Sequence, residues 1–327
     1  MCSSDLEGNV TDTSRRRHSL LMALPLDPEF SYSVSRAAKF ESCPRAYWLT
    51  YVGSWGGWAT GRNPHPRYTA ASARAYLLKH LQGRKGWIGD LLHALIAESL
   101  TARLTVEHAV GQLDARMRAG YGESVRGDYR HDPKRRTGLV EHHYDEPIPR
   151  PEWKQLRADA EAMLRRFFAG PWLGREAVYV ETPDRAPDTF EFEGTPIWGM
   201  PDFVWRRDDG LLVLTDWKTG RARPDAERLQ LLVYAAASIV KGRVFAAEEL
   251  GMQAVHLASD GPSEVLRVTQ AAIDEALAAV RTQIAAMRAV WPDEGAHPPS
   301  PGARGRGTAP PAGGSRRRPE CSPGPRR

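Results

Sequence analysis

The sequence predicts an α/β fold in which a small mixed sheet is flanked by helices, with an added helical region in front of it. Two patterns predict this class. Short apolar runs with β-branched members, typical of buried strands, lie at 177–181, 211–215 and 252–257. Apolar residues recur at helical spacing over 152–168 and 271–290. Strands and helices therefore alternate from residue 177 onward, after a first half that is mainly helical.

The first half is predicted to be helical because its apolar residues recur at helical intervals. Pro44 should divide the first helix, because proline removes a backbone donor and clashes with the preceding turn. The stretch 53–72 is rich in Gly, Trp and Pro and is predicted to be a loop. The helices expected in this half lie at 32–52, 72–82, 87–104 and 105–118.

The second half is predicted to build the sheet. A strand at 177–181 should be followed by 190–192 and 196–198, which we expect to continue the sheet towards Asp202. The run 211–215 follows the turn signal Asp209-Gly210, so 201–207 should pair with it as a hairpin. A further strand at 252–257 should pair with 265–268 across the turn 260–262.

Two acidic residues and a lysine lie at the end of this hairpin. Side chains alternate along a strand, so Asp216 and Lys218 should point the same way and Trp217 the opposite way. The hairpin can bring Asp202 beside Asp216. Two neighbouring carboxylates are costly unless they are protonated or share a cation, and oxygen ligands on a divalent ion are the usual solution. We therefore predict a metal site here.

A helix that follows the hairpin adds polar groups to the same end. Gln230 and Tyr234 are four residues apart and should share one helix face. Arg221 and Arg223 add positive charge near the mouth of the site.

This constellation resembles the PD-(D/E)xK nucleases, and within them the branch of the RecB nuclease domain and the Cas4-like exonucleases. The resemblance spans about residues 31–290 with a poorly matched insert, and it implies a restriction-endonuclease-like core. The matched segments are Tyr32–Arg36, Cys43–Tyr47, Gly89–His93 in the GxxxH spacing, Pro201-Asp202, Asp216–Gly220 and Gln230–Tyr234.

The resemblance implies a role for each matched residue. Mg²⁺ or Mn²⁺ would activate water and clamp the scissile phosphate of DNA, leaving 5′-phosphate and 3′-hydroxyl ends. The implied metal ligands are His93, Asp202, Asp216 and the backbone carbonyl of Trp217. The implied catalytic residues are Asp202, Asp216, Lys218 and Glu181. The implied substrate-binding residues are Gln230, Tyr234, Arg36, Arg45 and Arg221.

Several of these residues also have simpler interpretations. His93 taken alone is better interpreted as a partly buried core histidine, and Glu181 as an exposed residue at a strand end. Arg36 and Arg45 could belong to a solvated helix face. The basic insert 121–150 could be solvated or could line the substrate path. The whole chain could also be a catalytically silent module that binds nucleic acid or a partner.

Composition adds limits to these predictions. The net charge is +5, but 298–327 holds seven arginines and one glutamate, so the rest is close to neutral. Binding of DNA must therefore come from local patches. Three cysteines (2, 43 and 321) are too few for the four thiolates of an iron–sulfur cluster, so we expect none. We expect a cytoplasmic protein without membrane attachment, because no apolar run is long enough to span a bilayer.

The predicted organisation has four parts. They are a disordered arm at 1–28, a helical region at 29–176 with the GxxxH helix and the basic insert, a nuclease core at 177–292, and a disordered Pro/Gly/Arg tail at 293–327. The chain has no phosphate-binding GxxxxGK[ST] loop, so a helicase partner would have to supply any ATP-driven unwinding. A CRISPR adaptation protein is the alternative partner that the resemblance implies.

Overall fold

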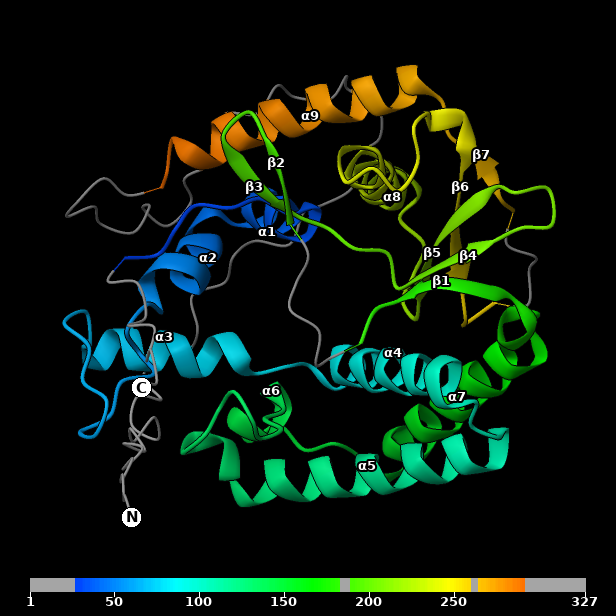
Figure 1. Ribbon diagram of the computed structural model, residues 1–327. Helices are drawn as coiled ribbons and strands as arrows, with labels where there is room; N and C mark the ends of the chain where they lie inside the picture. The colour runs from blue at the N-terminus through cyan, green and yellow to red at the C-terminus, as the bar shows by residue number, and fades with distance from the viewer. Residues whose placement is uncertain (1–26, 183–188, 260–263, 292–327) are drawn as a thin grey trace, which may run out of the picture.

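The computed structural model describes residues 27–182, 189–259 and 264–291 (Figure 1). The predicted disordered arm, except for Asp27 and Pro28, lies outside the described residues, and so do the predicted tail and the predicted turn at 260–262. Cys2 and Cys321 also lie outside them.

A five-stranded mixed sheet forms the centre of the fold. Its strand order is β1-β4-β5-β6-β7, and β5 pairs in parallel with β6 while the other neighbours are antiparallel. This confirms the α/β prediction and the predicted hairpin. The strands are β1 (Glu176–Val180), β4 (Phe203–Arg206), β5 (Leu212–Lys218), β6 (Leu250–His256) and β7 (Leu266–Arg267).

Two further strands, β2 (Thr189–Phe192) and β3 (Thr195–Trp198), form a separate hairpin. The prediction that they continue the central sheet is therefore wrong. The backbone of Tyr32 takes up the free edge of β3: its N–H donates to the Pro196 carbonyl at 2.9 Å and its carbonyl accepts from the Trp198 N–H at 2.7 Å. Figure 1 shows this hairpin lying over α9, away from the central sheet.

Helices cover both faces of the central sheet (Figure 1). Within the described ranges, no helix is both long and apolar enough to cross a membrane. The α-helices are α1 (Val34–Ser42), α2 (Pro44–Trp48), α3 (Ala70–His80), α4 (Arg84–Ala102), α5 (Val106–Arg126), α6 (Val140–His143), α7 (Arg150–Ala169), α8 (Pro224–Val240) and α9 (Gln270–Arg288). Short helical turns lie at Leu49–Gly53, Asp128–Arg130, Trp172–Gly174 and Ala247–Glu249.

The alternation of side chains along β5 divides the interior into two hydrophobic cores. Leu212 and Leu214 face α8, α9 and the N-terminal helices. Val213 and Trp217 face α4, α5 and α7. Because Asp216 has the same parity as Leu212 and Leu214, it points to the side of α8, opposite to Trp217 as predicted.

The helix predicted to end near residue 118 continues to Arg126 as α5. Gly120 and Gly122 lie in its last turns and would favour a break, but Gly120 packs against Trp87. An added Cβ would lie 2.5 Å from Cζ2 of Trp87 on α4, so only glycine lets the two helices approach this closely. The basic insert is also anchored in the fold, because Tyr129 and Leu139 are fully buried.

Candidate active site

The end of the β4–β5 hairpin holds the two predicted acids. Asp202 directly precedes β4, and Phe203 pairs with Thr215, so Asp202 is placed beside Asp216. Its Oδ2 accepts a hydrogen bond from the Trp217 backbone N–H at 2.8 Å. Its own carbonyl accepts from the Glu181 N–H at 2.9 Å. The sheet therefore fixes the backbone and the carboxylate of Asp202 together.

Asp216 belongs to a closed ring of polar contacts with β5 and α8. Lys218 Nζ lies 2.5 Å from Asp216 Oδ2 and donates to Gln230 Oε1 at 2.8 Å. Gln230 Nε2 donates in turn to the hydroxyl of Tyr234. That hydroxyl lies 3.5 Å from Asp216 Oδ1. The prediction that Gln230 and Tyr234 share a helix face is confirmed by these contacts.

Burial is the largest cause of the raised pKa values of Asp216 and Tyr234 in the ring. Asp216 is only 4% exposed. Burial and the negative charge of Asp202 raise the pKa of Asp216 to about 6, against the opposing charges of Lys218 and His93. Burial and the same two carboxylates raise the pKa of Tyr234 well above its usual value, so its hydroxyl keeps its proton. The ionised form of the buried Asp216 is therefore costly.

His93 reaches the site from α4, one helical turn after Gly89. Its Nδ1 lies 3.1 Å from Asp202 Oδ1. Burial alone would lower the pKa of His93, but the hydrogen bond and charge of Asp202, together with Asp216 and Asp90, raise it above its usual value. His93 is thus placed with the two acids, as the resemblance implies.

Gly89 on α4 lies close to Thr219, the residue that follows β5. An added Cβ would lie 2.9 Å from Thr219 Oγ1, whereas a Cβ at Gly86 in the same helix would meet nothing within 4 Å. The missing side chain at Gly89 lets α4 approach closely enough for His93 to reach Asp202.

Replacing Gly89 by leucine should therefore displace α4 and separate His93 from Asp202. We expect the cleavage rate to fall about 10²-fold, the size expected for a displacement of about 1 Å at a catalytic site. Gly86→Leu is the matched control and should keep full activity. Equal activity of the two variants in a cleavage assay would show that the approach of α4 does not matter.

Each of the two acids already has a basic side chain beside it. Asp202 contacts His93, and Asp216 contacts Lys218. In this arrangement, no three His, Cys, Asp or Glu side chains of the described part of the chain are grouped so that they could hold a metal ion. The donors themselves, two carboxylates and an imidazole, nevertheless suit a divalent ion in type. Such an ion would take the place of the two basic side chains, Lys218 and His93, beside the acids.

Glu181 and Arg36 line a pocket of about 370 Å³ beside the ring, together with Gln230 and Tyr234. The Glu181 carboxylate accepts from the Tyr179 hydroxyl. The Arg36 guanidinium lies over the rings of Tyr51 and Trp198, 4.6 and 5.1 Å from their centroids. The structure therefore places both residues at the rim of the site.

Two predicted substrate-binding residues lie further away. Arg45 is half-buried on α2 and does not line this pocket. Arg221 is exposed on the connection between β5 and α8 and makes no contact with the polar ring in the described part of the chain. Cys43 begins α2, where its Sγ accepts from the Ala46 N–H at 3.4 Å.

The sequence analysis missed a second polar pair next to Lys218. His256 ends β6 opposite Lys218, and its Nε2 lies 3.1 Å from Glu227 Oε2 on α8. The signal was present in the sequence, because two parallel strands joined by a helix end at the same sheet edge.

A model of the PD-(D/E)XK nuclease superfamily matches residues 31–307, which is most of the chain. No curated protein matches the chain significantly. The mixed five-stranded sheet flanked by helices is consistent with the restriction-endonuclease-like core of that superfamily. The chain, with its two acids and a lysine at the end of one hairpin, belongs to the PD-(D/E)XK nuclease superfamily.

Proposed function

We propose that this chain is a metal-dependent deoxyribonuclease that hydrolyses phosphodiester bonds. The observation that carries the proposal is the grouping of Asp202, Asp216 and Lys218 at one end of the β4–β5 hairpin, with His93 completing it from α4. Superfamily members are typically nucleases, which supports the same activity.

Each residue has a defined task in this proposal. A divalent ion would be held by Asp202, Asp216, His93 and the Trp217 carbonyl, and it would lower the pKa of a bound water and polarise the phosphate. Lys218 would orient that water and offset charge that develops on the phosphate. Gln230, which contacts Tyr234, would still hold Lys218 Nζ if Asp216 bound the metal. Arg36 and Glu181 lie where the strand would enter.

We also propose that cleavage starts from strand ends, as in an exonuclease. Gln230 and Tyr234 of the polar ring line a pocket of about 370 Å³, which is the size of a small-ligand site and suits a terminal nucleotide. A place in DNA repair, recombination or phage defence, and a helicase or CRISPR adaptation partner, are predictions from the resemblance to the RecB and Cas4-like branch.

A catalytically silent module is the second candidate. The observation that favours it is that Lys218 and His93 already satisfy the two acids. Against it, the pKa of Asp216 is raised to about 6, so this carboxylate is costly to keep charged without a stronger cation. A pure binding module has no need for such a group.

Cleavage of internally labelled DNA tests the proposal. Linear and circular single strands, and the corresponding duplexes, are incubated with Mn²⁺, with Mg²⁺ or with a chelator. We expect cleavage of linear strands, abolished by the chelator and restored by metal, with Mn²⁺ at least as effective as Mg²⁺ because imidazole suits Mn²⁺ better. Calorimetric binding of Mn²⁺ should accompany it. Nucleic-acid binding without metal binding or cleavage would support the silent module instead.

A further inference from the structure

A second, basic pocket lies between the end of α3 and the basic insert. It has a volume of about 330 Å³, and its charged lining consists of Lys79, Lys134, Arg135 and Arg136. Hydrogen bonds between Gln82 and the 138–140 backbone, at 3.0 and 2.9 Å, tie the insert to the start of α4. At Gly138 an added Cβ would lie 2.7 Å from the Tyr129 ring, so the turn fits closely on the core.

Most of this positive charge has no acidic partner. Arg136 is paired with Glu123 at 2.8 Å. In the part of the chain that the structure describes, Lys79, Lys134 and Arg135 form no salt bridge. Burial lowers the pKa of Lys79, and the positive charges of Arg36 and Lys134 lower it further. Three cations from separate parts of the chain therefore lie within electrostatic reach of one another.

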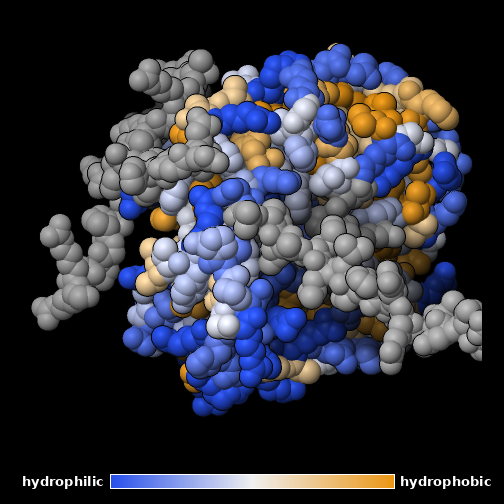
Figure 2. All heavy atoms as spheres, turned by 60° about the vertical axis from the view of Figure 1, so that its left-hand side comes forward, coloured by the Kyte–Doolittle hydropathy of each residue, from blue (hydrophilic) through white to orange (hydrophobic). Residues whose placement is uncertain are grey.

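Tyr51 connects this pocket with the one beside the polar ring. Lys79 Nζ lies 5.7 Å from the centroid of the Tyr51 ring, and the Arg36 guanidinium lies 4.6 Å from it. Lys79 lines the basic pocket, whereas Arg36 and Tyr51 line the pocket beside Gln230 and Tyr234. The face shown in Figure 2 is strongly hydrophilic over its lower part, where α3, α5 and α6 lie.

We propose that Arg36, Tyr51, Lys79, Lys134 and Arg135 form a continuous track that holds the phosphate backbone of a single nucleic-acid strand leading to the active site. The basic insert thus lines the substrate path. The inference rests on the proposed nuclease function, since it assigns the path along which the substrate strand reaches the active site.

Two observations favour a single strand over a duplex. Grooves for single strands combine cations that follow the backbone with aromatic rings, and this track combines Arg36 with Tyr51 and Trp198. The two pockets measure only about 370 and 330 Å³, so each has the size of a small-ligand site. A rigid duplex could not enter either pocket, whereas an unpaired nucleotide could.

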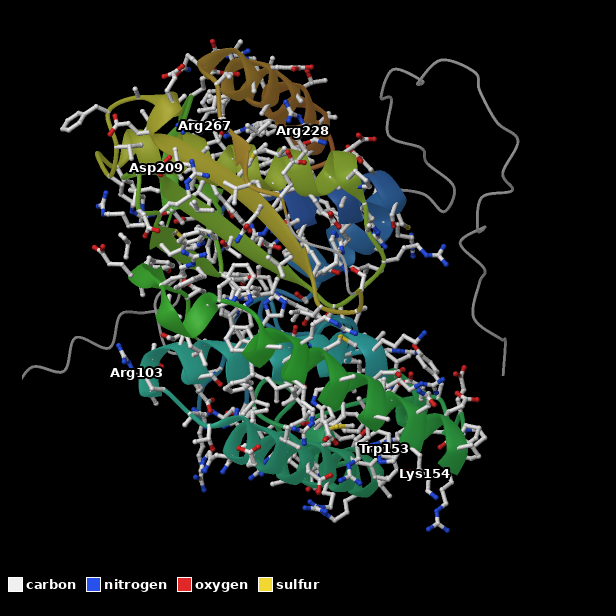
Figure 3. The ribbon with its side chains drawn as sticks, turned by 90° about the vertical axis from the view of Figure 1, so that its right-hand side faces the viewer. Arg103, Trp153, Lys154, Asp209, Arg228 and Arg267 are labelled. Atoms are coloured by element: carbon white, nitrogen blue, oxygen red, sulfur yellow. The ribbon has the colours of Figure 1, made fainter. Side chains whose placement is uncertain are left out.

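Binding without cleavage tests the track. The full chain with a chelator is titrated against a fluorescent DNA strand of about 20 nucleotides, longer than the roughly 4–16 that one such groove covers. Anisotropy is measured over a range of salt concentrations for the wild type and for Lys79→Gln/Lys134→Gln. The control, Arg103→Asn/Lys154→Gln, removes two exposed charges that line neither pocket and that lie at opposite ends of the lower helices in Figure 3. Asparagine suits the positive φ of 53° at Arg103.

The track predicts a specific change in salt dependence. Each lost phosphate contact on a single strand makes the negative slope of log K against log salt shallower by about 0.7. The slope of the double variant should therefore be shallower by about 1.4, and this variant should bind about 25-fold more weakly at 0.1 M salt. The control variant should stay within about twofold of the wild type, because neither of its charges lines a pocket of the track.

The other outcomes are equally informative. Three results would contradict the proposed track. The track variant could bind as tightly as the wild type, the wild type could bind no single strand, or the wild type could bind a duplex more tightly than a single strand. Cleavage is not needed for any of these measurements. Normal binding by an inactive wild type would therefore remove the nuclease proposal and leave the track intact.

Discussion

Replacing Asp216 by asparagine should lower the rate of DNA cleavage by about 10³-fold, the size expected when a metal loses a charged ligand that stabilises the transition state. Lys218→Met should cause a loss of about 10²–10⁴-fold, typical for a residue that assists proton transfer. Both are measured by single-turnover cleavage of labelled DNA with saturating Mn²⁺.

The Asp216 variant should lose activity without losing its fold. Burial and Asp202 raise the pKa of Asp216 to about 6, so the ionised carboxylate is costly in the absence of metal. Asparagine has the same shape and no charge, and we expect the melting temperature with a chelator to be unchanged or higher. Added Mn²⁺ should raise the melting temperature of the wild type but not of the variant, because only a bound ion stabilises the folded state.

The matched control is Asp208→Asn, in the exposed turn at the other end of the same hairpin. Figure 3 shows the neighbouring Asp209 in this turn, far from the end of β5 that carries Lys218. The control variant should cleave DNA like the wild type. An Asp216→Asn chain with undiminished activity would remove Asp216 from the mechanism.

Replacing Trp217 by alanine should destabilise the fold by about 3–5 kcal/mol, the usual loss for a large aromatic side chain removed from a core. Trp217 is 2% exposed. Its ring packs edge-on against Phe167 and Trp172, with centroids 5.5 and 5.1 Å away, and stacks on Phe203 at 6.2 Å. Chemical denaturation with a chelator measures the change in the free energy of unfolding.

The effects of replacing two adjacent residues, Trp217 and Lys218, should differ in kind. Trp217 and Lys218 are adjacent in the sequence but face opposite sides of the sheet, so Trp217→Ala should affect stability and Lys218→Met mainly activity. Trp198→Ala is the control for size, because Trp198 is 38% exposed and should cost clearly less. A loss of less than about 1 kcal/mol for Trp217→Ala would contradict the packing described here.

The sequence predicted the hairpin and the facing of its residues because both depend on local rules. Alternation along β5 placed Asp216 and Lys218 together and buried Trp217 on the other face. The helical spacing of Gln230 and Tyr234 likewise predicted a shared face, and both contact the ring around Lys218. The position of His93 came from the family resemblance, since a single helix cannot show what lies against it.

The failures concern contacts between distant segments. The β2–β3 hairpin pairs with the backbone at Tyr32, about 160 residues earlier, and strand alternation carries no information about such a partner. The end of α5 was misplaced because Gly120 satisfies a contact with Trp87 that only the fold reveals. The proposed basic track could not be predicted from the sequence for the same reason, since α1, α3 and the insert meet only in the folded chain.

Diffraction from crystals soaked in Mn²⁺ tests the central claim most directly, because the anomalous signal locates the ion without reference to activity. We predict a strong peak within about 2.0–2.3 Å of carboxylate oxygens of Asp202 and Asp216, with Lys218 still held by Gln230. Crystals of Asp216→Asn should lack that peak. A wild-type crystal with no ion between the two acids, or with both still paired to His93 and Lys218 at saturating Mn²⁺, would contradict the account.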